Sequence, residues 1–197
     1  MPIVIIGDGT ITGVSVGGLP DGIVDTDMIA NNAVTNAKAT GIAGGKLLSA
    51  AHGTQSTQFS HNTETYTDLN LSASITPQTN SKVLVFCDIF CRKAGVNYHG
   101  GYSVKLVRTP SGGSATAVYT DGSIPAIYDY HVGEGAEVWD TDKHPWNLID
   151  NSPGGDGSTA ITYKIQVAVY AQSGAAAMVF HAGSSGQSNI TLIEVGA

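Results

Sequence analysis

The sequence predicts an all-β protein in which a fibrous, self-associating N-terminal stalk precedes an antiparallel β-sandwich head. Two observations lead to this prediction. Residues 55–197 contain short segments rich in Val, Ile, Thr and Tyr, separated by clusters of Gly, Pro, Asn and Ser, which is the pattern of strands joined by turns. Residues 1–50 contain no Phe, Tyr or Trp, so they cannot alone bury enough apolar surface to offset the entropy of ordering their backbone.

The stalk, predicted over residues 1–50, alternates β-branched bursts with turn sequences. The bursts at residues 3–6, 10–12 and 14–16 are interrupted by Gly-Asp-Gly, Gly-Gly or Pro-Asp-Gly, which favour turns. Disorder is typical of segments with low hydrophobicity and high charge, whereas this segment carries apolar bursts. We therefore expect identical copies to wrap around one another and supply the missing core. Residues 41–54 are interpreted as a hinge between stalk and head.

The head, residues 55–197, is predicted to contain several short strands and no amphipathic helix. Many short strands separated by turn signals are typical of a β-sandwich or a jelly roll. The expected strands are residues 57–69, 71–75, 82–92, 102–108, 116–119, 161–170, 176–180 and 189–195.

The strand expected at residues 82–92 is apolar on both faces. One face alternates Val, Ile and Cys, and the other carries Leu84, Phe86 and Phe90, interrupted by Asp88. A two-layer sandwich buries only one face of each sheet. The second apolar face therefore indicates either contact with a neighbouring subunit or burial at the centre of one domain.

Composition and charge exclude several classes of function. Charged residues make up 13% of the chain, the net charge is −7 and no basic cluster occurs, which excludes nucleic-acid binding through phosphate neutralisation. We also expect synthesis in a cytoplasm and no membrane insertion, because a signal peptide and an apolar run of ~20 residues are both missing. Cys87 and Cys91 would lie ~13 Å apart along a strand, too far for a disulfide, and are expected to be small buried side chains.

Residues 120–158 are interpreted as a long irregular segment, and such segments in compact domains are often functional. Its aromatic rings suit the C–H faces of sugars, and its polar side chains suit sugar hydroxyls. The alternative is that the rings pack this segment onto the head or fill a subunit interface. The candidate receptor-binding residues are Tyr128, Tyr130, His131, Trp139, Asp140, Asp142, His144, Trp146 and Asn147.

No motif indicates catalysis, a cofactor or a metal. The Gly-Gly-Lys at residues 44–46 lacks the Gly and the hydroxyl residue that a phosphate loop requires. The sequence contains no Gly-x-Ser-x-Gly nucleophile motif, and its acidic residues show no signature of a paired-carboxylate glycosidase. Two alternative metal sites remain. The turns at residues 7–9 and 154–157 could hold calcium through carboxylate and carbonyl oxygens, and three copies of His52 or His61 could meet on a symmetry axis. We expect no enzymatic activity, no catalytic residues, no cofactor and no metal.

Four segments of the chain resemble phage tail-fibre proteins, particularly those of marine and freshwater phages including cyanophages. The first segment belongs to the stalk, and the others belong to the framing strands of the head, on either side of a middle that varies within the family. The segments are GDGTITGVSVGGLPDGIV at residues 7–24, YTDLNLSASITPQTNSKVLVF at 66–86, TAITYKIQVAVY at 159–170 and SNITLIEV at 188–195.

The resemblance implies a homotrimeric fibre located in the phage tail of the virion. Tail or baseplate proteins would hold its N-terminal stalk, and its C-terminal β-domain would point outward. The function it implies is adhesion of the particle to a host-surface glycan or protein receptor. One alternative is a non-adhesive virion component, such as a head fibre, decoration protein or baseplate protein. Another is a small glycan-degrading tailspike, although this chain is shorter than the β-helix of such enzymes usually requires.

Overall fold

The computed structural model describes residues 46–93, 99–122, 126–130, 140–171, 178–181 and 186–196. The chain divides into two units, Met1–Gly44 and Gly45–Ala197, and every described residue belongs to the second. The predicted stalk, residues 1–50, therefore lies outside the described residues except at its C-terminal end. The trimeric, intertwined state of the stalk stays a prediction.

The described residues form eleven β-strands and no helix, as the sequence predicts for the head. The strands are β1 (Leu47–Gln55), β2 (Phe59–His61), β3 (Thr67–Ile75), β4 (Lys82–Lys93), β5 (His99–Pro110), β6 (Thr116–Thr120), β7 (Ile127–Tyr130), β8 (Asp140–Asp150), β9 (Ile161–Ala171), β10 (Met178–Phe180) and β11 (Ser188–Val195).

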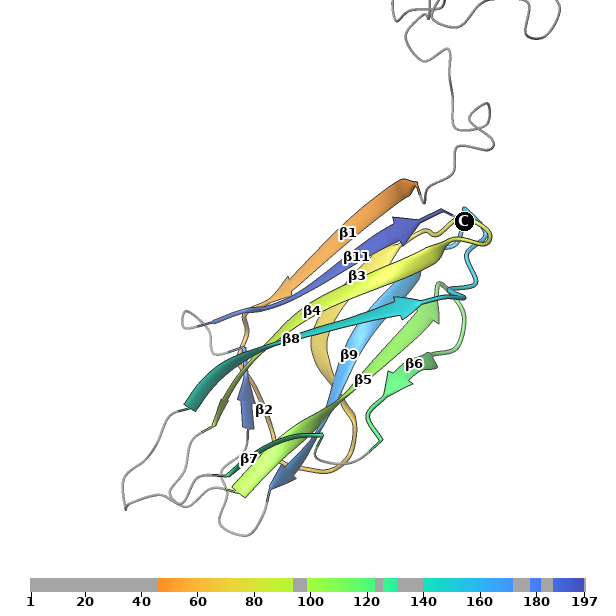
Figure 1. The fold of residues 1–197 in the computed structure, drawn as a ribbon. Coiled ribbons are helices and arrows are strands. Elements are labelled where there is room, and N and C mark those ends of the chain that lie inside the picture. Colours follow the sequence, from red (N-terminus) through yellow and green to blue (C-terminus); the bar gives the residue numbers. More distant parts are fainter. Residues whose placement is uncertain are drawn as a thin grey trace, which may run out of the picture. The chain divides into compact units, whose positions relative to one another are not determined.

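These strands build two antiparallel sheets that pack face to face (Figure 1). The six-stranded sheet has the order β1-β11-β4-β10-β2, with β8 on the other side of β4. The five-stranded sheet has the order β3-β9-β5-β6, with β7 also paired to β5. The predicted antiparallel β-sandwich is confirmed.

The strand order is that of a jelly roll. Both β10 and β11 pair with β4, and both β6 and β7 pair with β5. In the same way, β1 pairs with β11 and β2 pairs with β10. The pairs β1/β2, β6/β7 and β10/β11 can therefore each be counted as one interrupted strand. Counted in this way, the first strand pairs with the last, β3 with β9, β4 with β8, and β5 with β6 and β7. A single long antiparallel hairpin rolled into two sheets has this pairing.

The core lies between the sheets and follows from the two-residue alternation of strand side chains. Alternate residues of β4 and β9, the central strands, point inward and are buried together with those of β3, β5 and β11. Cys87 and Cys91 are buried thiols, as predicted. Burial, with a smaller contribution from Asp88, raises the pKa of the Cys87 thiol to about 12, so this thiol is unreactive at neutral pH.

A buried carboxylate joins the two sheets. Asp150, on β8, is 4% exposed. It accepts a hydrogen bond of 2.6 Å from Nη1 of Arg108 on β5, and one of 2.9 Å from the hydroxyl of Tyr163 on β9. Because the partners come from the opposite sheet, this cluster holds the sheets in one relative position. Removing one partner of such a pair is costly, since the other charge stays buried.

A buried histidine joins the sheets at a second point. His181 follows β10 with a φ of 51°, and its Nε2 lies 3.0 Å from the carbonyl oxygen of Leu69 on β3. Its Nδ1 lies 2.7 Å from Oγ of Ser188, which accepts a hydrogen bond from the backbone N–H of Phe90. A carbonyl only accepts, so Nε2 carries a proton. Burial lowers the pKa of His181 and so favours the neutral ring, in which Nδ1 accepts from the Ser188 hydroxyl. The ring is therefore neutral and fully bonded.

Two segments differ from the sequence-based expectation. Residues 47–54, expected in the hinge, belong to β1 and pair with β11. Residues 120–158, expected to be irregular, contain β7 and the eleven-residue β8. Both β1 and β8 are poor in β-branched residues, and β8 contains Pro145, which β-sheets tolerate at an edge. Their strand structure comes from pairing with distant segments and not from local propensity.

The edge strands β1 and β3 of the two sheets approach each other closely at Gly53, so we expect that only glycine fits at this position. A Cβ on Gly53 of β1 would lie 1.9 Å from the backbone oxygen of Ser72 on β3. We expect Gly53→Ala to lower the free energy of unfolding by about 2 kcal/mol or more, since backbone must move to relieve the overlap. Denaturant titration at fixed protein concentration measures this.

The matched control is Gly122→Ala. A Cβ there meets no atom within 4 Å, so the expected change is within about 0.5 kcal/mol. Equal effects of the two substitutions would contradict the close approach of β1 and β3.

The buried His181 ring predicts a loss of stability at mildly acidic pH. Burial lowers the pKa of His181 from its ordinary value of 6.5. Below pH 6.5 the unfolded chain therefore binds a proton that the folded chain does not, and the free energy of unfolding falls as pH decreases. Urea titrations between about pH 7.5 and 5 measure this slope.

The control variant is His181→Asn, because Asn tolerates the positive φ at this position. The variant should be less stable than the parent at neutral pH. Its free energy of unfolding should also fall less steeply as the pH decreases, because the titrating ring has been removed. An identical slope in the two proteins would show that His181 is not the titrating group.

Candidate functional site

The sandwich has two ends, defined here by the direction of β4. At the near end, Lys82 pairs with Val195, and Lys46 accepts a backbone hydrogen bond of 2.8 Å from Gly196. At the far end, Lys93 pairs with Asp140. At ~3.3 Å per residue, the two ends of β4 lie ~36 Å apart.

The predicted receptor-binding residues divide into two groups, and the first belongs to the far end. Tyr128 and Tyr130 lie on β7, which ends at Tyr130 opposite His99 at the start of β5. Asp140 and Asp142 lie on the first residues of β8, opposite the end of β4. His131 and Trp139 belong to the connection between β7 and β8 and lie outside the described residues.

The second group, His144, Trp146 and Asn147, lies in the middle of β8, and its two aromatic rings pack into the sandwich. The Trp146 ring lies 5.3 Å from the Tyr119 ring, with 55° between their planes, and packs against the buried core. The His144 ring lies edge-on to the Tyr102 ring, with centroids 5.7 Å apart. The contacts of these two residues agree with the alternative in which the aromatic rings pack this segment onto the head. Their role in receptor binding stays a prediction.

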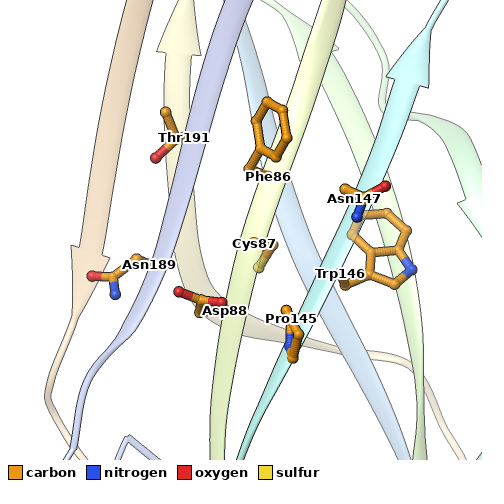
Figure 2. A pocket seen from close by; sticks show the side chains of 8 residues that line it. All are labelled: Phe86, Cys87, Asp88, Pro145, Trp146, Asn147, Asn189 and Thr191. Atoms are coloured by element: carbon orange, nitrogen blue, oxygen red, sulfur yellow. The ribbon is translucent and has the colours of Figure 1, made fainter.

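Asn147 points the other way and lines a hollow on the outer surface of the six-stranded sheet. Figure 2 shows this hollow across β11, β4 and β8, with the Phe86 and Asn147 side chains on neighbouring strands. Its volume is about 130 Å³. The lining residues are Phe86, Cys87, Asp88, Pro145, Trp146, Asn147, Asn189 and Thr191.

The register explains why these residues meet. Phe86 lies opposite Thr191 of β11 and Asn147 of β8. Two residues further along β4, Asp88 lies opposite Asn189 of β11 and Pro145 of β8. All of them share the outward face because strand side chains alternate with period two. The sequence feature that indicated this surface is the second apolar face of the strand expected at residues 82–92.

The hollow offers apolar contact and hydrogen-bonding groups to a ligand. Its lining combines Phe86 and Trp146 with amides, a hydroxyl and the carboxylate of Asp88, which Nζ of Lys143 approaches to 3.4 Å. Within the described ranges, no three His, Cys, Asp or Glu side chains are placed to hold a metal ion. In the same ranges, no helix is long and apolar enough to cross a membrane.

No protein-family model and no curated protein matches the sequence. Among solved structures, the chain is similar to a chain in the structure of infectious bursal disease virus strain Gt, with 13% identity and a TM-score of 0.40, over 76% of this chain and 38% of that chain. It is also similar to the VP2 subviral particle of that virus, with 14% identity and a TM-score of 0.35, over 74% of this chain and 39% of that chain. The chain thus spans under two fifths of these viral chains, and no function is carried over from them.

The packing of Trp146 predicts different effects for two neighbouring substitutions. We expect Trp146→Ala to lower the free energy of unfolding by about 2 kcal/mol, because it removes a half-buried ring from the edge of the core. Chemical denaturation followed by circular dichroism measures this.

Asn147→Ala, on the opposite face, should change the free energy of unfolding by no more than about 0.5 kcal/mol. If both variants were as stable as the parent, Trp146 would not be part of the packing and would again be a candidate ligand contact.

Proposed function

We propose that this protein is a structural component of a phage virion: a trimeric tail or baseplate fibre that attaches the particle to the host cell surface. Residues 1–50 hold the fibre in the particle and join three copies. The β-sandwich head carries the receptor-binding site at its far end. The resemblance to phage tail-fibre proteins and the jelly-roll head together support this proposal.

One observation supports the adhesive role: four of the candidate residues, Tyr128, Tyr130, Asp140 and Asp142, lie at the end of the sandwich opposite the point where the chain enters the head. The chain enters the head at Lys46, beside Gly196, whereas β7 ends and β8 begins at the far end. An attachment protein held through its N-terminal segment must present its receptor site away from that anchor. The ~36 Å length of β4 separates the two, and binding residues commonly lie on loops that a rigid scaffold positions.

The receptor class that best fits the far end is a glycan. Tyr128, Tyr130 and Trp139 supply flat apolar rings, and Asp140 and Asp142 supply acceptors for sugar hydroxyls. A single site of this kind binds weakly. Three heads on one fibre raise the avidity by ~10²–10⁴ when several sites engage together.

The far-end site predicts a selective loss of cell attachment. In the full-length protein, residues 131–139 are replaced by a Gly-Ser segment of the same length. We expect attachment to host cells to fall ~100-fold or more, because multivalent binding magnifies the loss of each site. Flow cytometry of labelled protein on host cells measures this, and removal of surface glycans from the cells should have the same effect.

The matched control is the same replacement of residues 111–115, which connect β5 to β6 at the near end. This variant should attach normally. Equal attachment of both variants, at the level of the parent, would favour the non-adhesive virion component. Release of oligosaccharides from host polysaccharide by the parent protein would favour the glycan-degrading enzyme.

A further inference from the structure

The outer face of the six-stranded sheet carries an apolar surface that the head leaves uncovered. Ala50, Ile193, Leu84 and Ile149 form one row across β1, β11, β4 and β8, each opposite the next in register. Phe86 lies next to this row on β4. These five residues are called the outer apolar face below. Ile149 is 49% exposed and Phe86 is 46% exposed.

The outer face of the five-stranded sheet is polar in comparison. Nζ of Lys164 lies 3.0 Å from a carboxylate oxygen of Asp68, and the hydroxyls of Ser74 and Thr162 lie 2.8 Å apart. The exposed large hydrophobic residues of the described chain are Leu47, Phe86 and Ile149, and all three lie on the six-stranded sheet. The outer faces of the two sheets therefore differ in polarity.

We propose that a second copy of this chain covers the outer apolar face in the assembled protein. The face has the composition of a subunit interface, in which an apolar centre is bordered by polar groups. Lys82 is exposed at the near end of β4, and the Asp88–Lys143 ion pair lies towards the far end. Aromatic and aliphatic anchors such as Phe86 and Ile149 are the side chains that contribute most at such interfaces.

The size of the face favours a copy of the chain over an unrelated partner. The face covers four strands ~4.8 Å apart and, from Leu84 to Phe86, about three residues along β4, which is roughly 19 by 10 Å, or about 190 Å² in projection. A stable interface between separate proteins buries about 800 Å² on each partner. A smaller face suffices when the partners are already linked, because linkage raises their effective concentration to about the millimolar range. Copies joined through the residues that precede Lys46 meet this condition, and this step rests on the proposed fibre.

The hollow beside Phe86 has room for an anchor from the neighbouring copy. Its volume is about 130 Å³, and a cavity of about 150 Å³ holds a benzene ring. The hollow opens on the same surface as the outer apolar face. The neighbouring copy therefore excludes water from Phe86 and from the hollow together.

Thiol labelling of the full-length protein tests whether the face is covered. The probe is a maleimide dye, and the two variants are Ile149→Cys on the face and Ala117→Cys on exposed β6 of the other sheet. The parent, whose Cys87 and Cys91 are buried, sets the background. We expect the Ile149→Cys thiol to react about 10-fold or more slowly than the Ala117→Cys thiol. Equal rates would overturn the proposal.

Adding Phe86→Glu to the Ile149→Cys variant tests whether the cover is another copy. The carboxylate introduced at position 86 would have to lose its water on association. Self-association measured by analytical ultracentrifugation should therefore weaken roughly 30-fold or more, and maleimide labelling of the thiol at position 149 should become fast. Phe86→Lys is the second variant, since charge of either sign should act alike. A full-length parent that is monomeric at micromolar concentration, or slow labelling that persists in folded Phe86→Glu protein, would overturn the proposal.

The adhesion assay separates this inference from the proposed function. If the face is an interface and the far end is not adhesive, Phe86→Glu weakens self-association, while the parent and the variant with residues 131–139 replaced attach equally to host cells. If the far end is adhesive and the face is not an interface, loop replacement abolishes attachment while labelling at position 149 is fast.

Discussion

A two-layer sandwich can bury only one face of each sheet, and β4 is apolar on both. The inward side chains of this strand, among them Val85 and Ile89, form the centre of the core. Its outward side chains Leu84 and Phe86 cannot enter that core, because neighbouring residues of a strand point to opposite faces. Since β4 pairs with β11 and β10 on one side and β8 on the other, one strand organises both the fold and the outer apolar face.

Two buried polar clusters hold the sheets against each other, one near each end. Asp150 binds Arg108 and Tyr163 across the layers near the near end, and His181 reaches the carbonyl of Leu69 towards the far end. Apolar contacts are non-directional, whereas these hydrogen bonds have a required geometry. The two clusters therefore fix the relative position of the sheets at both ends of the sandwich.

The two proposed activities use different parts of the sandwich. The proposed attachment site lies at the far end, and the proposed assembly surface is the outer face of the six-stranded sheet. The aromatic residues that looked alike in the sequence therefore separate by position. Trp146 packs against Tyr119, while the connection that contains Trp139 leaves from the far end. Trp146 belongs to β8, whereas Trp139 precedes this strand and lies outside the described residues, and residue type alone does not reveal this difference.

The sequence by itself determined the all-β class, the main strands of the core, the buried cysteines and the doubly apolar strand at residues 82–92, because two-residue alternation and turn chemistry are local properties. Only the tertiary structure decided that residues 47–55 and 140–150 are strands and that Asn147 shares a surface with Phe86. Those features depend on pairing between segments far apart in the chain, such as β1 with β11. An edge strand of low propensity acquires its conformation from the partner that supplies its hydrogen bonds.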